Sequence, residues 1–287
     1  MTDAKSQLFP GTQFISTVLD ALETKTAMSG ALARVYLMRA AMAGVIIGIL
    51  YLADFAVLAV FSEVGGGSFA ALGRIVGALV FGFALVFIYY SKSELLTSNM
   101  MIVSIGRYYK RITVLRSLRV LGLCYLGNFL GGLALALLLW GSTLADGAVG
   151  DELTAAVDHK LEYVAEGLTG WGDLFVRAIL CNFMINLAML LVYNGTIKED
   201  LMKSVAMIVS VFIFAFIGFE HSVANTVVFT MVGLQDGIDL GLAFGNLAIV
   251  LAGNFIGGGL LIGIYYAYAN DARKHLDRRS RRQRPVD

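Results

Sequence analysis

The sequence predicts an all-α membrane protein with six transmembrane helices, and three observations support this. Of the 287 residues, 58% are hydrophobic and 15% are charged, whereas soluble domains are about 45–50% apolar and about 25% charged. Six apolar stretches approach or exceed the roughly 20 residues that a helix needs to cross a bilayer. Thirty-two glycines against two prolines favour closely packed helices in lipid. These features exclude an ordinary globular enzyme, a disordered chain and a nucleic-acid binder.

Two of the predicted spans are followed by unusual polar segments. The second and fifth spans are each followed by a polar interruption and then by a second, short apolar piece. The interruptions read ELLTSN at 94–99 and FEHSVAN at 219–225. The predicted spans are 35–61, 70–90, 118–141, 174–193, 201–218 and 242–269.

Charge placement predicts the orientation of the chain. Residues 107–119 hold five Lys and Arg and residues 273–284 hold seven, whereas 145–173 hold seven acids and one lysine. Because cytoplasmic loops are rich in Lys and Arg, both termini are expected in the cytoplasm, with the protein in a bacterial-type inner membrane. The expected domains are an N-terminal amphipathic cytoplasmic segment (1–30), a transmembrane channel domain (31–270) and a basic cytoplasmic tail (271–287).

The N-terminal segment contains a short amphipathic helix at about 8–26. Its apolar side chains fall on one side of the helix, which fits either the membrane surface or the protein's own bundle. Packing on the bundle is the favoured alternative. The apolar residues are Phe9, Phe14, Val18, Leu19 and Leu22.

An internal repeat relates the two halves of the chain. Glu94 and Glu220 are 126 residues apart, and Asn99 and Asn225 are separated by the same distance. Three coincidences at one offset indicate a duplicated unit. The third is a hexapeptide that reads GNFLGG at 127–132 and GNFIGG at 253–258.

The repeat predicts where a transport path lies. Each copy, at about 35–141 and 174–269, holds three spans. Three is an odd number, so the second copy must insert upside down. Inverted repeats place a transport site near the bilayer midplane, where helices are broken. Irregular backbone at that depth is tolerated only inside protein or along a cavity, so the two interruptions mark the expected path.

The interruptions also hold the candidate chemical groups. His221 is the one histidine predicted at membrane depth, where an ionisable residue suggests function. Neutral imidazole both donates and accepts hydrogen bonds, so it can relay a proton or hand one to a solute. Thr97 is the expected counterpart in the first interruption, with its hydroxyl available to His221.

Further polar residues near the breaks have expected structural roles. Glu94 and Glu220 can accept unpaired backbone N–H groups of the half-helices that follow them. Asn182 and Asn186 are four residues apart on the fourth span and share one face. They either line the path or bond neighbouring helices. The residues assigned a structural role at the breaks are Glu94, Glu220, Asn99 and Asn225.

Taken together, these motifs resemble the formate/nitrite transporter family, which includes formate, nitrite and hydrosulfide channels. The resemblance covers about residues 8–269. It implies an aquaporin-like protomer with two broken helices, assembled as a homopentamer with a pore in each protomer. The family's central histidine, its partner threonine and its pore-facing asparagine match His221, Thr97 and Asn182, whereas Asn186 occupies a position expected to be apolar or Cys. The sharpest matches are at 94–99, 127–132, 179–182, 218–225 and 253–258.

The resemblance also implies apolar constrictions above and below the histidine. A bare ion at the bilayer centre costs at least about 2.5–3.5 kcal/mol, so such a path favours a species that can become neutral. Leu96 stands where the formate channel has Phe, which predicts a wider gate. The constriction residues are Phe81, Leu85, Leu95, Leu96, Ile185 and Phe214.

The outer vestibule decides the expected substrate. Anion-conducting members of the family carry a lysine there, upstream of the pore-facing asparagine. An ungapped count back from Asn182 gives Glu166, and a gapped alignment gives Lys160; the ungapped match is preferred. Because a carboxylate repels anions and concentrates cations, the leading expectation is ammonium, which Glu166 attracts and which passes His221 and Thr97 as ammonia. The alternative is a proton-coupled channel for formate, nitrite or hydrosulfide.

No motif in the sequence points to catalysis, a metal or a cofactor. Cys124 and Cys181 lie within apolar runs and suggest neither a disulfide framework nor a metal site. No HExxH or GxSxG pattern is present, so no enzymatic activity is expected. The net charge of +1 favours no nucleic acid. The expected partners are a small monovalent ion or its neutral conjugate, the lipid bilayer and further copies of the chain.

Overall fold

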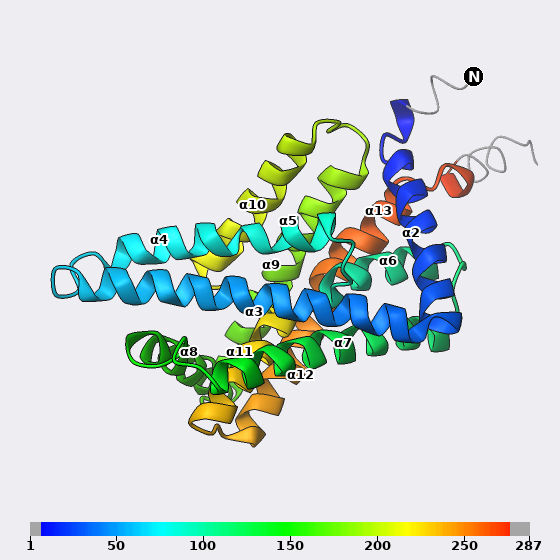
Figure 1. Ribbon diagram of the computed structural model, residues 1–287. Coiled ribbons are helices and arrows are strands. Elements are labelled where there is room, and N and C mark those ends of the chain that lie inside the picture. Colours follow the sequence, from blue (N-terminus) through cyan, green and yellow to red (C-terminus); the bar gives the residue numbers. More distant parts are fainter. Residues whose placement is uncertain (1–6, 276–287) are drawn as a thin grey trace, which may run out of the picture.

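The computed structural model describes residues 7–275, which form helices without any strand (Figure 1). The predictions for residues 1–6 and for the tail beyond 275 lie outside this range. The helices are α2 (Thr12–Ala31), α3 (Ala33–Glu63), α4 (Ala70–Phe81), α5 (Phe83–Tyr90), α6 (Leu96–Tyr108), α7 (Val114–Trp140), α8 (Ala148–Ala165), α9 (Leu168–Tyr193), α10 (Asp200–Ile217), α11 (Ser222–Gln235), α12 (Leu240–Asn254), the π-helix η1 (Phe255–Ile264) and α13 (Tyr265–Ala269).

The prediction of six membrane spans is confirmed. Six helical segments of the described chain are long and apolar enough to cross a membrane. Several extend past the predicted apolar stretches, as in Ala33–Glu63 and Leu168–Tyr193. Ala70–Tyr90 contains α4 and α5, which meet at Gly82, and Leu240–Ala269 contains α12, η1 and α13.

Glycines at equivalent places in the two repeats set the helix spacing. A Cβ on Gly131 of α7 would lie 1.8 Å from the Ala41 carbonyl oxygen of α3. In the second repeat, a Cβ on Gly257 of η1 would lie 2.0 Å from the Ile179 carbonyl oxygen of α9. A side chain fits at neither position, so both hexapeptides serve the same close backbone contact.

A shorter helix precedes the first span of each repeat. Helix α2 precedes α3, and α8 precedes α9, so the repeat includes these two short helices as well as the spans. In α2, Phe14, Val18 and Leu22 are buried in the main core. The apolar side of α2 therefore packs on the protein's own bundle, which was the favoured alternative.

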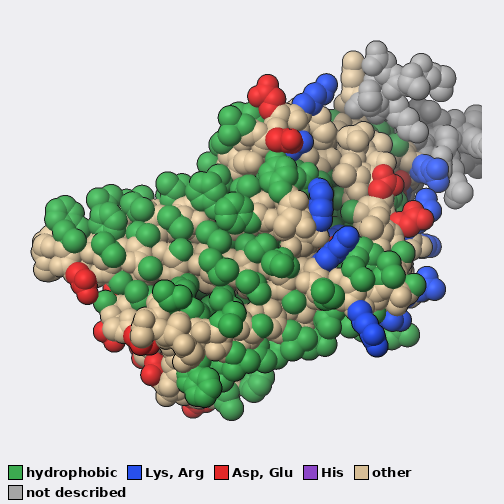
Figure 2. All heavy atoms as spheres, in the orientation of Figure 1, with side chains coloured by type: hydrophobic (Ala, Val, Ile, Leu, Met, Phe, Trp, Pro, Cys, Tyr) green, Lys and Arg blue, Asp and Glu red, His purple; other side chains and the backbone are tan. Residues whose placement is uncertain are grey.

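Charge is segregated along the molecule (Figure 2). Lys and Arg gather toward the end where α2 meets the start of α7, whereas Asp and Glu dominate around α8, with an apolar surface between. This distribution matches the charge pattern of the sequence.

Candidate functional site

The site lies where the half-helices α6 and α11 begin. In the first repeat, Asn128 of α7 holds the break together. Its Oδ1 accepts the N–H of Leu96 at 3.1 Å, and its Nδ2 donates to the carbonyls of Ala40 and Glu94, each at 2.8 Å. One buried amide thus fixes the start of α6 against two other elements.

The second repeat makes the same contacts with Asn254. Its Oδ1 accepts the N–H of Ser222 at 2.9 Å, and its Nδ2 donates to the carbonyls of Ala178 and Glu220 at 2.8 and 2.9 Å. The asparagines of the two GNF motifs therefore cap the half-helices. Glu94 and Glu220, expected in that role, instead use their carboxylates to bind Lys25 and Lys160.

His221 and Thr97 meet between the two breaks. Their Nε2 and Oγ1 atoms are 3.1 Å apart, and both side chains are buried. The N–H of Ala224 donates to His221 Nδ1 at 3.0 Å. Because Nδ1 accepts, the proton of a neutral His221 lies on Nε2 and points to the Thr97 hydroxyl. The repeat counterpart of His221, 126 residues earlier, is Leu95 rather than Thr97.

A small cavity of about 20 Å³, the central cavity, lies beside His221. Five of the six expected constriction residues line it, and Leu96 does not. Sequence reasoning missed four further lining residues, because their apolar side chains look like ordinary span residues. The lining residues are Ile47, Phe81, Ala84, Leu85, Ile88, Leu95, Ile185, Val211, Phe214 and His221.

Asn182 and Asn186 bond neighbouring backbone. Asn182 Nδ2 donates to the carbonyls of Thr97 and Asn254 at 3.1 and 2.7 Å, and Asn186 Nδ2 donates to the Thr97 carbonyl at 3.2 Å. Neither residue lines the cavities described here. Of the two alternatives left open by the sequence, the structure places them in the role of holding helices together.

A cavity of about 330 Å³ on the α8 side of His221, the Lys160 cavity, contains a buried ion pair. Lys160 Nζ lies 2.8 Å from Glu220 Oε1, and Asn225 Nδ2 donates to Glu220 Oε2 at 2.6 Å. Burial disfavours the Lys160 charge, but the adjacent Glu220 carboxylate outweighs it and holds the pKa of Lys160 above its usual value. Lys160 therefore stays protonated at neutral pH.

Glu166 lies elsewhere, and this corrects the preferred alignment. It follows the last residue of α8, is exposed, and is not among the residues lining the Lys160 cavity. After Lys160, helix α8 continues to Ala165, and α9 begins only at Leu168, well before Asn182. Lys160 and Asn182 are thus joined by helix apart from the short turn at Glu166 and Gly167, so no loop marks where a gap in the alignment would fall.

A second cavity with an equivalent Lys–Glu pair lies on the opposite side of His221, and the sequence did not predict it. A cavity of about 270 Å³, the Lys25 cavity, is lined by Lys25 of α2 together with Glu94 and Asn99. Lys25 pairs with Glu94, and Asn99 Nδ2 donates to Glu94 Oε2 at 3.1 Å. Lys25 falls outside the repeated spans, so the constant offset could not identify it. Its position in an amphipathic helix before the first span was the one available signal.

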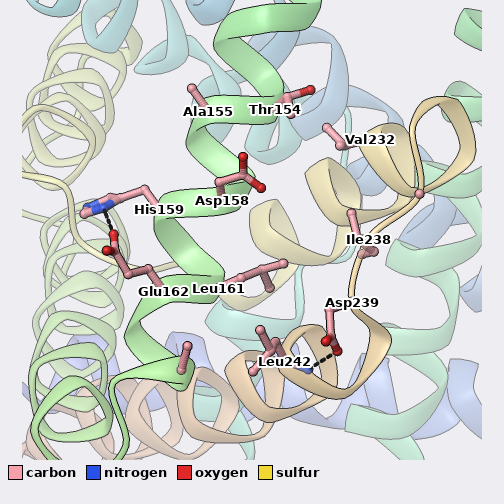
Figure 3. A pocket seen from close by; sticks show the side chains of 12 residues that line it. Thr154, Ala155, Asp158, His159, Leu161, Glu162, Val232, Ile238, Asp239 and Leu242 are labelled. Carbon is pink, nitrogen blue, oxygen red and sulfur yellow. Dashed lines mark hydrogen bonds and ion pairs between the residues drawn. The ribbon is translucent and has the colours of Figure 1, made fainter.

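The largest of these hollows lies away from the site. It measures about 910 Å³, and its lining residues come from α8, α11, the start of α12 and the segment that joins α11 to α12 (Figure 3). His159 and Glu162 approach to 3.7 Å at its edge. Because Lys160, Glu220 and His221 are all absent from its lining, this hollow is not part of the path.

Comparison with known proteins agrees with this geometry. The family profile described as "Formate/nitrite transporter" matches residues 12–268. The chain belongs to the formate/nitrite transporter family. The family is one of channels and transporters rather than enzymes, and its members are multi-pass membrane proteins.

Three curated relatives illustrate the similarity. The formate channel FocA of Haemophilus influenzae is 32% identical over 221 residues, which cover 69% of this chain and 74% of the relative. A probable formate transporter of Methanothermobacter thermautotrophicus is 32% identical over 69% of this chain and 76% of the relative. The transporter YrhG of Bacillus subtilis, of uncharacterised function, is 28% identical over 84% and 85%.

Solved structures share the fold. An ion channel of this transporter family aligns with a TM-score of 0.76 at 24% identity, covering 90% of this chain and 99% of that one. A pentameric formate channel with formate bound aligns with a TM-score of 0.64 at 23% identity, covering 82% and 96%. The prediction of an all-α membrane fold with six spans is thereby confirmed.

Proposed function

We propose that this chain conducts a small weak-acid anion of the formate/nitrite type through a pore in each protomer. The observation that carries this proposal is an excess of positive charge in both cavities. Lys25, Arg39 and Lys92 face one acid, Glu94, in the Lys25 cavity. Among the residues that line the Lys160 cavity, Arg74, Lys160 and Arg177 outnumber Asp54 and Glu220, and Asp173 pairs with Arg177 from outside the lining.

This charge balance argues against the ammonium channel expected first. That expectation depended on Glu166 in the vestibule, and Lys160 occupies the cavity instead. A cavity with excess cations raises the local concentration of anions and lowers that of ammonium. The relatives named as formate channels favour the same alternative.

The central cavity suggests that the solute crosses in its neutral form. Its lining is apolar apart from His221, and a bare ion in such surroundings is costly. A carboxylate that takes a proton from water in either cavity becomes a neutral acid. His221, the one polar residue in this lining, then offers a hydrogen bond midway with Thr97 against its Nε2, and the acid releases its proton to water in the opposite cavity.

The same proposal covers assembly and orientation. Large apolar side chains remain exposed along the spans, as on α3, α4 and α12, which fits a homopentamer embedded in lipid. The basic end that includes α2 is assigned to the cytoplasm and the acidic end around α8 to the outside. The Lys160 cavity is then the outer vestibule and the Lys25 cavity the inner one. The segments 1–30 and 271–287 are cytoplasmic.

Uptake into proteoliposomes tests the proposal. The purified protein should accelerate uptake of labelled formate and nitrite over protein-free vesicles, and more strongly as the pH falls. Labelled methylammonium should enter at the protein-free rate. Accelerated methylammonium uptake with formate at background would overturn the proposal.

A further inference from the structure

Two arginines occupy equivalent positions at the two ends of the path. The N–H of Glu94 donates to the Arg39 carbonyl at 3.2 Å, and the N–H of Glu220 donates to the Arg177 carbonyl at 3.4 Å. Each arginine is therefore bonded through its backbone to the glutamate of a bonded Lys–Glu–Asn group. These groups are Lys25–Glu94–Asn99 and Lys160–Glu220–Asn225. Arg39 lines the Lys25 cavity and Arg177 lines the Lys160 cavity.

Neither guanidinium uses all of its donors. Arg177 Nε donates to Asp173 Oδ1 at 3.0 Å and its Nη1 donates to the Gly218 carbonyl at 2.9 Å. Arg39 Nη1 donates to Met28 Sδ at 3.3 Å, which is a weak acceptor. Among residues 7–275, no carboxylate pairs with Arg39. Since a guanidinium carries five N–H donors, each arginine keeps several for a solute in its cavity.

We propose that Arg39 and Arg177 are a symmetric pair of recognition residues that favour anions with two oxygens on one atom, such as carboxylates and nitrite, over linear or single-centre anions. The inference rests on the proposed anion conduction and names the substrate class within it. The ammonium groups of Lys25 and Lys160 are compact charges that attract any anion, whereas a planar guanidinium fork matches two neighbouring oxygens.

A purely structural role does not account for both arginines. Arg177 ties down Gly218, which ends α10 in a left-handed conformation with φ of 81°. The repeat counterpart of Gly218 is Lys92, also left-handed with φ of 56°. Within the described residues Arg39 makes no bond to the Lys92 carbonyl. The bond from the arginine side chain to the backbone thus occurs in the second repeat only. In both repeats, however, the arginine lies next to the glutamate and lines the cavity.

The test compares formate with azide, a linear weak-acid anion whose terminal atoms cannot both face one side of the fork. Initial uptake of each anion below saturation is measured in proteoliposomes of matched orientation, with protein-free rates subtracted. The variants are Arg39→Lys and Arg177→Lys. Arg34→Lys is the matched control, because Arg34 is an exposed arginine of α3 that lines none of these cavities.

Each lysine variant keeps the positive charge at its position but lacks the planar pair of N–H donors of a guanidinium. Formate uptake should fall about fivefold, the order expected for one partly hydrated charge-assisted hydrogen bond, and azide uptake should change less than twofold. Arg34→Lys should leave the uptake of both anions unchanged. Because Arg39 holds no backbone carbonyl, its variant keeps the test valid if Arg177→Lys is unstable.

Two outcomes would overturn the inference while leaving the proposed function intact. One is an equal loss of formate and azide uptake in the Arg39 variant, which indicates a general structural or charge effect. The other is wild-type uptake of both anions in both variants. Failure of the wild-type protein to conduct either anion would instead overturn the proposed function, and the inference with it.

Discussion

Replacing Lys160 by glutamine should reduce anion uptake by about tenfold. The substitution removes the cation that lies 2.8 Å from Glu220 and leaves that acid in the cavity. An anion about 6 Å from Lys160 Nζ gains about 3 kcal/mol of attraction at an effective dielectric near 20. In a water-filled cavity with twice that dielectric the gain is about 1.4 kcal/mol, which corresponds to about tenfold in local concentration.

The experiment needs a second variant, because breaking a buried ion pair by removing one partner is strongly destabilising, by about 3–5 kcal/mol. Lys160→Gln is therefore compared with the double variant Lys160→Gln/Glu220→Gln, which restores charge balance. Formate uptake in proteoliposomes should recover in part in the double variant. Thermal unfolding in detergent reports whether each protein remains folded.

Glu166 provides the matched control. Glu166→Gln and Glu166→Lys change an exposed charge outside the cavity, so each should leave formate uptake within twofold of wild type. Unchanged uptake in folded Lys160→Gln, or a large gain in Glu166→Lys, would refute the assignment of Lys160 to the path.

Three further predictions follow from packing and charge. Gly44→Ala should destabilise the fold by about 1–3 kcal/mol or more, because its Cβ would lie 2.0 Å from the Asn128 carbonyl oxygen. Gly122→Ala should leave the stability unchanged, because there is open space around Gly122. Equal unfolding temperatures of the two variants would contradict this prediction. Phe214→Ala should enlarge the central cavity and raise acetate uptake relative to formate; an unchanged ratio would count against the constriction. Lys160→His should retain uptake relative to wild type below pH of about 6.5, the ordinary histidine pKa, and lose it above, whereas wild type shows no such step because the Lys160 pKa is raised.

The fold was predictable because its signals are periodic or repeated. Six long apolar runs fixed the number of spans, and the constant offset between Glu94 and Glu220 identified the duplication. Close helix contact was also enough to explain why both hexapeptides are rich in glycine. These features depend on local composition and on sequence spacing, both of which a single sequence displays.

The ends of the path were harder to predict because they are assembled from segments outside the repeated spans. Lys25 and Lys160 come from α2 and α8, and an ungapped count back from Asn182 leads to Glu166 rather than to Lys160. The capping role of Asn128 and Asn254 was hidden for a different reason. A buried asparagine in a glycine-rich span fits general helix packing equally well, and its specific partners appear only in three dimensions.

The sign of the pH change inside a vesicle tests the central claim most directly. Proteoliposomes of the wild-type protein carry a pH-sensitive dye and receive a pulse of ammonium formate. If the pore passes the neutral acid of a small anion, the protein adds a rapid acidification to the protein-free trace, because formic acid releases its proton inside. A rapid protein-dependent alkalinisation, caused by ammonia taking up protons, would contradict the account.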